Sequence, residues 1–141
     1  MPIRKGSAEW KGALVDGSGT VRSETGAVEG AYSFSSRFES GTGTNPEELI
    51  GAAHAACFSM HLSHGLANAG HAPQSVKTEA RVHIEKGEAG FSITRVDLVT
   101  EARVPGIEAG QFQEMAAESQ RECPVSKALS AVPIHLEASL A

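Results

Sequence analysis

Cysteine is scarce in this sequence: Cys57 and Cys123 are the only 2 cysteines among 141 residues, and they lie far apart. Small secreted domains that depend on disulfides have more cysteines, at shorter spacings. The chain is therefore not expected to be such a domain. Two distant cysteines leave three interpretations open, namely unrelated buried thiols, a redox pair, or part of a metal site.

Basic residues are also in the minority. The chain has 12 Lys and Arg against 17 Asp and Glu, which gives a formal net charge of −5. Proteins that bind nucleic acid or anionic membranes reach the phosphates with a basic surface. We therefore predict that this protein binds neither nucleic acid nor membranes.

Long apolar runs are absent as well. The longest mostly apolar stretch is Leu49–Met60, and Gly51 and His54 interrupt it. A helix that spans a bilayer needs about 20 apolar residues. Residues 1–5 lack the apolar core and cleavage site of a signal peptide. The expected location is the cytoplasm.

The length is that of one domain, so we predict a single domain over residues 1–141. The hydrophobic pattern predicts N-terminal strands at Ser7–Lys11, Thr20–Ser23 and Val28–Phe34, followed by a loop from Ser35 to Thr44. Further along it predicts a strand Val76–Glu85, a strand Phe91–Val104 with a bulge near Arg95, a helix Glu108–Glu122, a short helix Pro124–Leu129 and a strand Val132–Leu140. This order of elements indicates the α+β class.

A long helix between these regions has the clearest start signal in the sequence. Asn45 suits the N-cap, Pro46 the first helical position and Glu48 the third, as in a capping box. The helix should run to about Asn68, with Gly70 ending it. Its middle is small or apolar on every side, which is typical of a helix buried all round. One chain of this length has difficulty enclosing such a helix, so we expect a partner chain to cover it.

The two cysteines differ in their predicted positions. Cys57 lies in the middle of the long helix, where a small buried hydrophobe is the more common role. A thiolate there would need a cationic neighbour because the helix N-terminus is too distant, and Arg37 in the preceding loop is a candidate. Cys123 precedes Pro124 and is the predicted N-cap of the short helix, where the helix dipole favours a thiolate. Such a pair suits a peroxidatic and a resolving cysteine.

Histidines also lie along the long helix. Taking about 100° per residue, one arc of roughly 100° contains the side chains of His54, Cys57, His61, His64 and His71. Histidines and cysteines at such spacings can bind zinc, although histidines on a helix face more often satisfy hydrogen bonds in the core or at an interface. A zinc site remains an alternative at this point.

The segment Thr42–Phe58 resembles the signature of the OsmC/Ohr family of hydroperoxide reductases, and most closely its OsmC branch. The same family pattern is matched by Ser36-Arg37-Phe38-Glu39, by Val104-Pro105-Gly106 and by Cys123-Pro124-Val125-Ser126. The resemblance implies an OsmC-like fold, with antiparallel sheets and a long central helix. It also implies an intertwined homodimer with active sites at the subunit interface.

The resemblance further implies a thiol-dependent peroxidase of the oxidative and osmotic stress response. Organic hydroperoxides would be its substrates, reduced to alcohols, and hydrogen peroxide would be reduced less well. Cys57 matches the peroxidatic cysteine that becomes a sulfenic acid, and Cys123 the resolving cysteine that closes an intrachain disulfide with it. Arg37 matches the arginine that stabilises the thiolate, and Glu48 the glutamate that orients Arg37. No cofactor is implied, neither metal, flavin nor haem, and a dithiol reductant of the lipoyl type would regenerate the thiols.

Two points lie outside this resemblance. It gives no role to His61 and His64, and the same fold could instead serve as a small-ligand binding or sensing module with inert cysteines.

Helix geometry constrains the role of Glu48, because nine steps of about 100° place it on the face opposite Cys57 and roughly 13 Å away along the axis. We therefore expect Glu48 to act at the Cys57 of the partner chain, in addition to its capping role.

Overall fold

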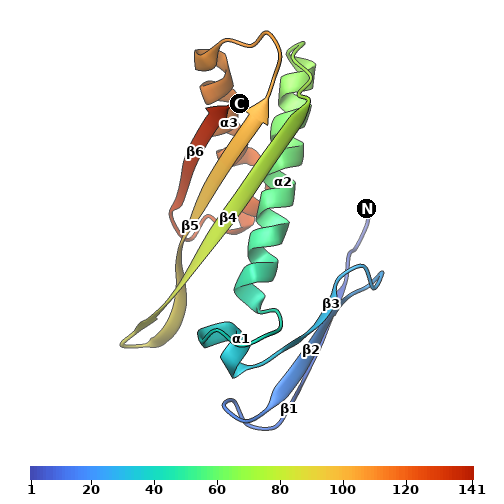
Figure 1. Cartoon of the computed structure of the whole chain (residues 1–141), viewed down its shortest axis with the longest axis vertical. Helices are drawn as coiled ribbons and strands as arrows, with labels where there is room; N and C mark the ends of the chain where they lie inside the picture. The colour runs from blue at the N-terminus through green and yellow to red at the C-terminus, as the bar shows by residue number, and fades with distance from the viewer. The chain divides into compact units, whose positions relative to one another are not determined.

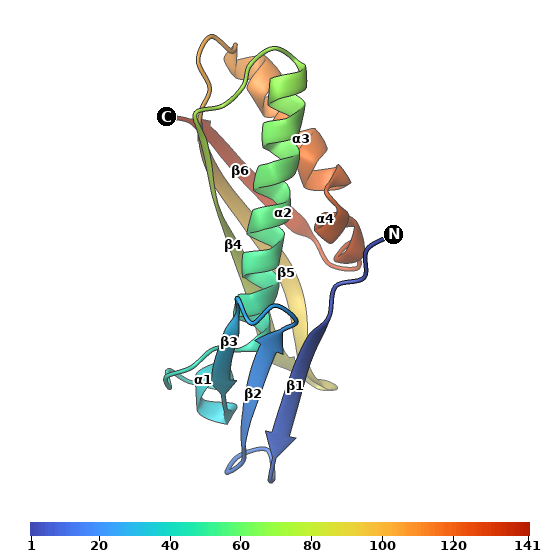
Figure 2. The ribbon, with the colours of Figure 1, turned by 90° about the vertical axis from the view of Figure 1, so that its right-hand side faces the viewer.

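The computed structural model describes all residues from Met1 to Ala141. The chain divides into two compact units, Met1–Leu49 and Ile50–Ala141. Figures 1 and 2 show the course of the chain from the N-terminal strands, through the long helix, to the C-terminal sheet and helices. Each unit is described by itself.

The first unit contains a three-stranded antiparallel sheet and a short helix. The strands are β1 (Gly6–Lys11), β2 (Ser18–Ser23) and β3 (Glu29–Tyr32), in the order β1-β2-β3. Helix α1 (Phe34–Phe38) follows, where the sequence predicted a loop. That prediction was wrong because Ser33 and Ser36 form a capping box: the Ser36 amide donates to Ser33 Oγ at 3.1 Å, and the Ser33 amide donates to Ser36 Oγ at 2.8 Å. The box satisfies backbone donors at the helix start without the glutamate or glutamine that the usual pattern has.

Helix α2 (Pro46–Asn68) begins and ends as predicted. The Glu48 amide donates to Asn45 Oδ1 at 2.7 Å, so Asn45 is the N-cap. At the other end Gly70 has a φ of 88°, and the His71 amide donates to the Leu66 carbonyl at 2.8 Å. Glycine adopts this left-handed conformation at little cost, which is why the helix ends there.

Helix α2 is buried on one face only. Phe58, Leu62 and Leu66 are fully buried, whereas Ala56 is exposed and Met60 is 75% exposed. A single chain therefore leaves one face of α2 uncovered, as expected from its length, and cover of that face by a partner chain stays a prediction. None of the helices is both long and apolar enough to cross a lipid bilayer.

The second unit contains the other sheet. Strands β4 (Ser75–Gly87) and β5 (Gly90–Arg103) form an antiparallel hairpin, and β6 (Ile134–Leu140) pairs with β5. The register shifts between His83 and Ile84, opposite the segment before Arg95, which confirms the predicted bulge. Strand β6 departs from the antiparallel expectation because it runs parallel to β5. The helices between these strands return the chain to the other end of β5, as a parallel pair requires.

Those helices are α3 (Ala109–Glu122) and α4 (Pro124–Ala128), close to their predicted bounds. Helices α2 and α3 lie on one face of the second sheet (Figure 2). The core between these helices and the sheet consists of Phe58, Leu62, Leu66, Val96, Leu98, Ala102, Phe112, Ala116 and Cys123. One of the two cysteines is thus a core residue, at the point where α4 begins. The mixed helix and sheet content confirms the α+β class.

Candidate functional site

The two cysteines are neighbours within the second unit. Cys57 lies on α2, and Cys123 is the N-cap of α4, as the sequence predicted. The Cys57 thiol interacts with the Cys123 thiol and accepts a hydrogen bond from the Val125 backbone. Both cysteines are free thiols; Cys123 is fully buried and Cys57 partly exposed. The structure therefore places the two thiols next to each other, with the more accessible one on the long helix.

The groups that shift the pKa of Cys57 include no charged side chain of another residue type. Burial raises the pKa of the Cys57 thiol above its ordinary value, the hydrogen bond from Val125 lowers it, and the adjacent Cys123 raises it again. No cation is among the groups that shift this pKa. A reactive cysteine needs a lowered pKa, since the thiolate is the nucleophile. The second unit alone thus keeps Cys57 protonated.

A histidine and a serine extend the cysteine pair. Cys123 Sγ donates to Ser126 Oγ at 3.1 Å, and Ser126 Oγ lies 2.7 Å from His54 Nε2. His54 is fully buried, and burial lowers its pKa, so the ring is neutral. The sequence indicates His54 only as part of the histidine stripe and Ser126 only as part of the motif at Cys123, with no role for either. The available signals were the spacing of Ser126 three residues after an N-cap cysteine, and of His54 one helical turn before Cys57.

The first unit holds an ion pair between Arg37 and a glutamate. Arg37 Nη2 donates to Glu47 Oε1 at 2.7 Å, and Arg37 Nε lies 3.2 Å from both Glu47 oxygens. The Glu47 side chain is 8% exposed and that of Arg37 36%. A guanidinium held by a forked pair of this kind keeps one orientation and stays charged.

Within the chain, Glu47 holds Arg37, where the resemblance implied Glu48. Within the chain, the partner of Arg37 is Glu47, whereas the Glu48 carboxylate accepts a hydrogen bond from Thr44 Oγ1 at 3.1 Å. Successive residues of a helix point about 100° apart, and here Glu47 and Glu48 have different partners. Glu48 is the exposed one of the two, and its amide completes the N-cap.

Arg37 lies beside an aromatic hollow in the same unit. Its Cζ is 5.1 Å from the centre of the Phe38 ring. A cavity of about 210 Å³ is lined by Arg37 together with Trp10, Leu14, Tyr32 and Phe34, among others. Such a lining can accept an apolar group while the guanidinium binds a polar end.

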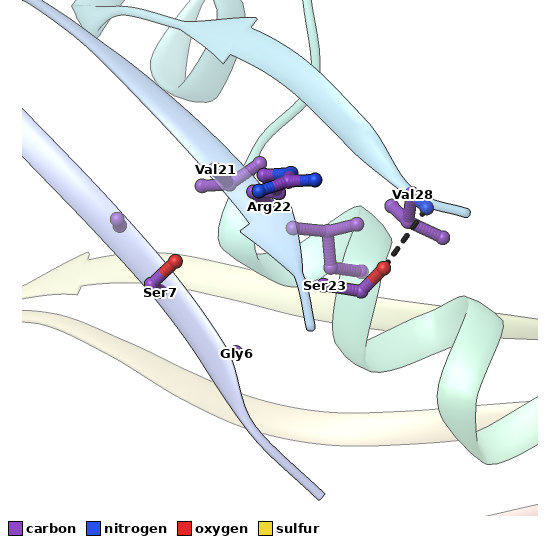
Figure 3. A pocket seen from close by; sticks show the side chains of 8 residues that line it. Gly6, Ser7, Val21, Arg22, Ser23 and Val28 are labelled. Atoms are coloured by element: carbon purple, nitrogen blue, oxygen red, sulfur yellow. Dashed lines mark hydrogen bonds between the residues drawn. The ribbon is translucent and has the colours of Figure 1, made fainter. Parts of the chain in front are cut away.

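A second hollow of the first unit, of about 400 Å³, lies on its sheet (Figure 3). Val21, Val28 and Leu49 are among its lining residues, and the Val28 amide donates to Ser23 Oγ at 3.0 Å. No cysteine, histidine or carboxylate lines this hollow. Its serines, Ser7 and Ser23, therefore have no histidine or carboxylate in the lining to act as a base.

The histidine stripe does not converge on one point. His54 bonds to Ser126, His61 Nδ1 lies 2.9 Å from Ser119 Oγ, and His64 Nε2 lies 3.1 Å from Asn68 Nδ2. No three His, Cys, Asp or Glu side chains are arranged to hold a metal ion. The zinc alternative thus has no ligand set in this structure.

Comparisons with known proteins find members of one family. The family model described as OsmC-like protein matches residues 39–137. The chain is 50% identical over 129 residues to the peroxiredoxin OsmC of Escherichia coli (strain K12), which covers 91% of this chain and 90% of the relative.

Two solved structures share the fold. One is the organic hydroperoxide resistance protein OhrB of Bacillus subtilis, with a TM-score of 0.71 at 25% identity, covering 97% of this chain and 98% of that one. The other is a putative organic hydroperoxide resistance protein of Vibrio cholerae with captopril bound in one active site. Its TM-score is 0.74 at 27% identity, covering 99% of this chain and 93% of that one. These likenesses confirm the expected fold.

Proposed function

Because the chain belongs to the OsmC family, we propose that it is a thiol-dependent peroxidase that reduces organic hydroperoxides to alcohols, and hydrogen peroxide less efficiently. The observation that carries this proposal is the contact between the Cys57 and Cys123 thiols. A binding module with inert cysteines would not need two thiols of distant segments to meet, so that alternative is less favoured.

The reaction has two chemical steps on the protein. The Cys57 thiolate attacks a peroxide oxygen; an S–O bond forms, the O–O bond breaks, and the alkoxide leaves and takes up a proton as the alcohol. Cys123 then attacks the sulfur of the Cys57 sulfenic acid. A disulfide forms within the chain, and the sulfenic oxygen leaves with the thiol proton as water. An external dithiol of the lipoyl type reduces the disulfide by thiol–disulfide exchange, and no cofactor takes part.

Arg37 supplies the charge that the cysteine surroundings lack. Its guanidinium, oriented by Glu47, lowers the pKa of Cys57 when the two meet in the working assembly. The aromatic hollow beside Arg37 accepts the organic group of the substrate, which explains the preference over hydrogen peroxide.

The working assembly is a homodimer in which Arg37 and Glu47 of one chain act at Cys57 of the other. The exposed apolar face of α2 supports this, because a second chain would cover it. The family match extends across both compact units, which supports one OsmC-like domain over residues 1–141. The two free thiols fit a reducing compartment, the cytoplasm, and a role in the response to oxidative or osmotic stress.

A comparison of the two cysteine variants tests the proposal. Wild type treated with one equivalent of cumene hydroperoxide should lose both thiols of each chain and form the Cys57–Cys123 disulfide within the chain. Cys57→Ser should lose none and have no turnover. Cys123→Ser should gain the mass of one oxygen atom, then stall and overoxidise. Thiol titration and intact mass on non-reduced protein measure all three. Unchanged thiols in wild type would overturn the proposal.

A further inference from the structure

The resolving thiol has no access to solvent. Cys123 is 0% exposed, so water does not reach its sulfur in this structure. The thiol must nevertheless lose a proton when its sulfur bonds to another sulfur, because the thiolate is the nucleophile. The hydroxyl that its S–H contacts is that of Ser126, at 3.1 Å. The proton therefore has a protein group as its first acceptor.

The serine leads on to a base. Ser126 is 2% exposed, and its Oγ lies 2.7 Å from Nε2 of the fully buried His54. The three side chains come from α2 and α4 and form one hydrogen-bonded row inside the second unit. When Nδ1 carries the ring hydrogen, Nε2 can accept the serine proton while Ser126 Oγ accepts from Cys123.

One ring nitrogen of His54 is buried without a hydrogen bond. This Nδ1 is the one buried side-chain nitrogen or oxygen atom with no hydrogen-bond partner. A buried polar atom without a partner costs about 1–3 kcal/mol in general, and such atoms in native proteins call for an explanation. A histidine kept for packing alone gains nothing from this arrangement. The one hydrogen bond that His54 does make leads to the resolving thiol.

We propose that Ser126 and His54 are positioning residues that orient Cys123 and take up its proton in the second step of the proposed peroxidase reaction. The Cys123 proton moves to Ser126 Oγ as the serine proton moves to His54 Nε2. Cys123 Sγ bonds to Cys57 Sγ, and the S–O bond of the sulfenic acid breaks. The leaving hydroxide takes up the proton that the imidazolium releases, so that the products are one disulfide and one water. The inference rests on the proposed function, because that function makes Cys123 the attacking thiol.

The surroundings of His54 agree with a transient acceptor. Burial lowers the pKa of the imidazole, so the ring is neutral before the step and releases the proton readily after it. The burial of Cys123 also keeps substrate away from its sulfur.

The test follows the attack of Cys123 without peroxide. The reagent 5,5′-dithiobis(2-nitrobenzoate) forms a mixed disulfide on Cys57 and releases one thionitrobenzoate. Cys123 then attacks that disulfide and releases a second. Stopped-flow absorbance separates the two releases in His54→Gln, Ser126→Ala and Ser126→Thr. The matched control is His61→Gln, which changes a histidine of the same helix whose serine partner, Ser119, contributes no side-chain bond to a cysteine.

We expect the second release to slow by about a hundredfold in His54→Gln and Ser126→Ala. Ser126→Thr keeps the hydroxyl, so its second release should be close to the wild-type rate. His61→Gln should also leave the rate of the second release unchanged. The first release should be close to wild type in all four, which separates a proton-transfer role from a general loss of folding. A wild-type second rate in both His54→Gln and Ser126→Ala would overturn the inference.

A second experiment, with peroxide in place of the disulfide reagent, distinguishes this inference from the proposed function. With cumene hydroperoxide, the same two variants should form the Cys57 sulfenic acid at the wild-type rate and the disulfide more slowly. If wild type fails to react with peroxide while the reagent assay shows slowed second releases, the peroxidase function is wrong and the role of His54 and Ser126 stands. If peroxide reacts and neither assay separates the variants from wild type, the inference is wrong and the function stands.

Discussion

The cysteine pair and the arginine–glutamate pair have opposite surroundings. In the second unit, Cys57 is surrounded by a thiol, a backbone amide and apolar side chains, and burial raises its pKa. In the first unit, Arg37 and Glu47 form a forked ion pair beside aromatic rings. One region has a nucleophile without a charge to activate it, and the other has a charge without a nucleophile. Neither region has both groups, so the proposed function needs Arg37 of one chain at Cys57 of another.

Breaking the fork of the arginine should have the largest effect. Arg37→Lys keeps the positive charge but loses the planar donors that hold Glu47 and face a thiolate together. We expect kcat/KM for cumene hydroperoxide to fall by roughly ten- to a thousandfold, which corresponds to about 1.4 to 4 kcal/mol. Steady-state kinetics with an excess of dithiol reductant measure this. Activity within a factor of two of wild type would mean that Arg37 does not act on the thiol.

Mixed dimers test whether Arg37 acts at the Cys57 of its own chain or of the other chain. Arg37→Ala and Cys57→Ser should each be strongly impaired as homodimers. In a heterodimer made by co-refolding them, one site combines an intact Cys57 with an intact Arg37 of the other chain. We expect that heterodimer to regain about half of the wild-type activity per dimer. A heterodimer no more active than its parents would place Arg37 and Cys57 of the same chain together.

Two adjacent glutamates provide a matched pair for a smaller effect. Glu47→Gln removes the charge that holds Arg37, so we expect kcat/KM to fall by about tenfold, as for the loss of one charge-assisted hydrogen bond. Glu48→Gln changes an exposed side chain that bonds to Thr44, and activity should stay near wild type. The opposite order of effects would restore Glu48 to the role that the resemblance implied.

The smallest effect is expected at an ion cluster of the second sheet. Asp97 bonds to His83 at 2.8 Å and to Arg95 at 3.3 Å, and the hydrogen bond from His83 is the main cause that lowers its pKa. A carboxyl group with a lowered pKa in the fold contributes stability at pH values above its unfolded-state pKa. This contribution is lost as the pH falls through its folded-state pKa. Asp97→Asn should therefore be slightly less stable at pH 7 and equal to wild type in strong acid, without a change in activity. Urea unfolding at both pH values measures this, and an equal difference at the two would contradict the assigned cause.

Much of the fold could be predicted from local signals. The Asn45 cap, the glycine at position 70 and the alternation of β4 each depend on neighbouring residues, and the structure confirms them. Helix α1 was missed because a capping box of two serines is a weaker signal than one with glutamate. The parallel pairing of β6 was missed because strand direction depends on where α3 and α4 return the chain.

The candidate site divides in the same way. Cys57, Cys123 and Arg37 could be found because the family motif places them, and the reactive types are few in this sequence. Glu47 was missed because adjacent glutamates look alike until the helix start fixes which of them faces α1. Ser126 and the special position of His54 were missed because their hydrogen bond joins segments far apart in the sequence.

The pH dependence of Cys57 alkylation tests whether the two regions meet. The measurement uses iodoacetamide on Cys123→Ser, so that one thiol reacts, with either Arg37 or Arg37→Gln. Within the second unit, burial raises the Cys57 pKa, and in the proposed assembly the Arg37 guanidinium lowers it. We predict that the midpoint of the alkylation profile lies at clearly lower pH with Arg37 than with Arg37→Gln. The same midpoint in both proteins would contradict the account, because the charge would then not act on the thiol.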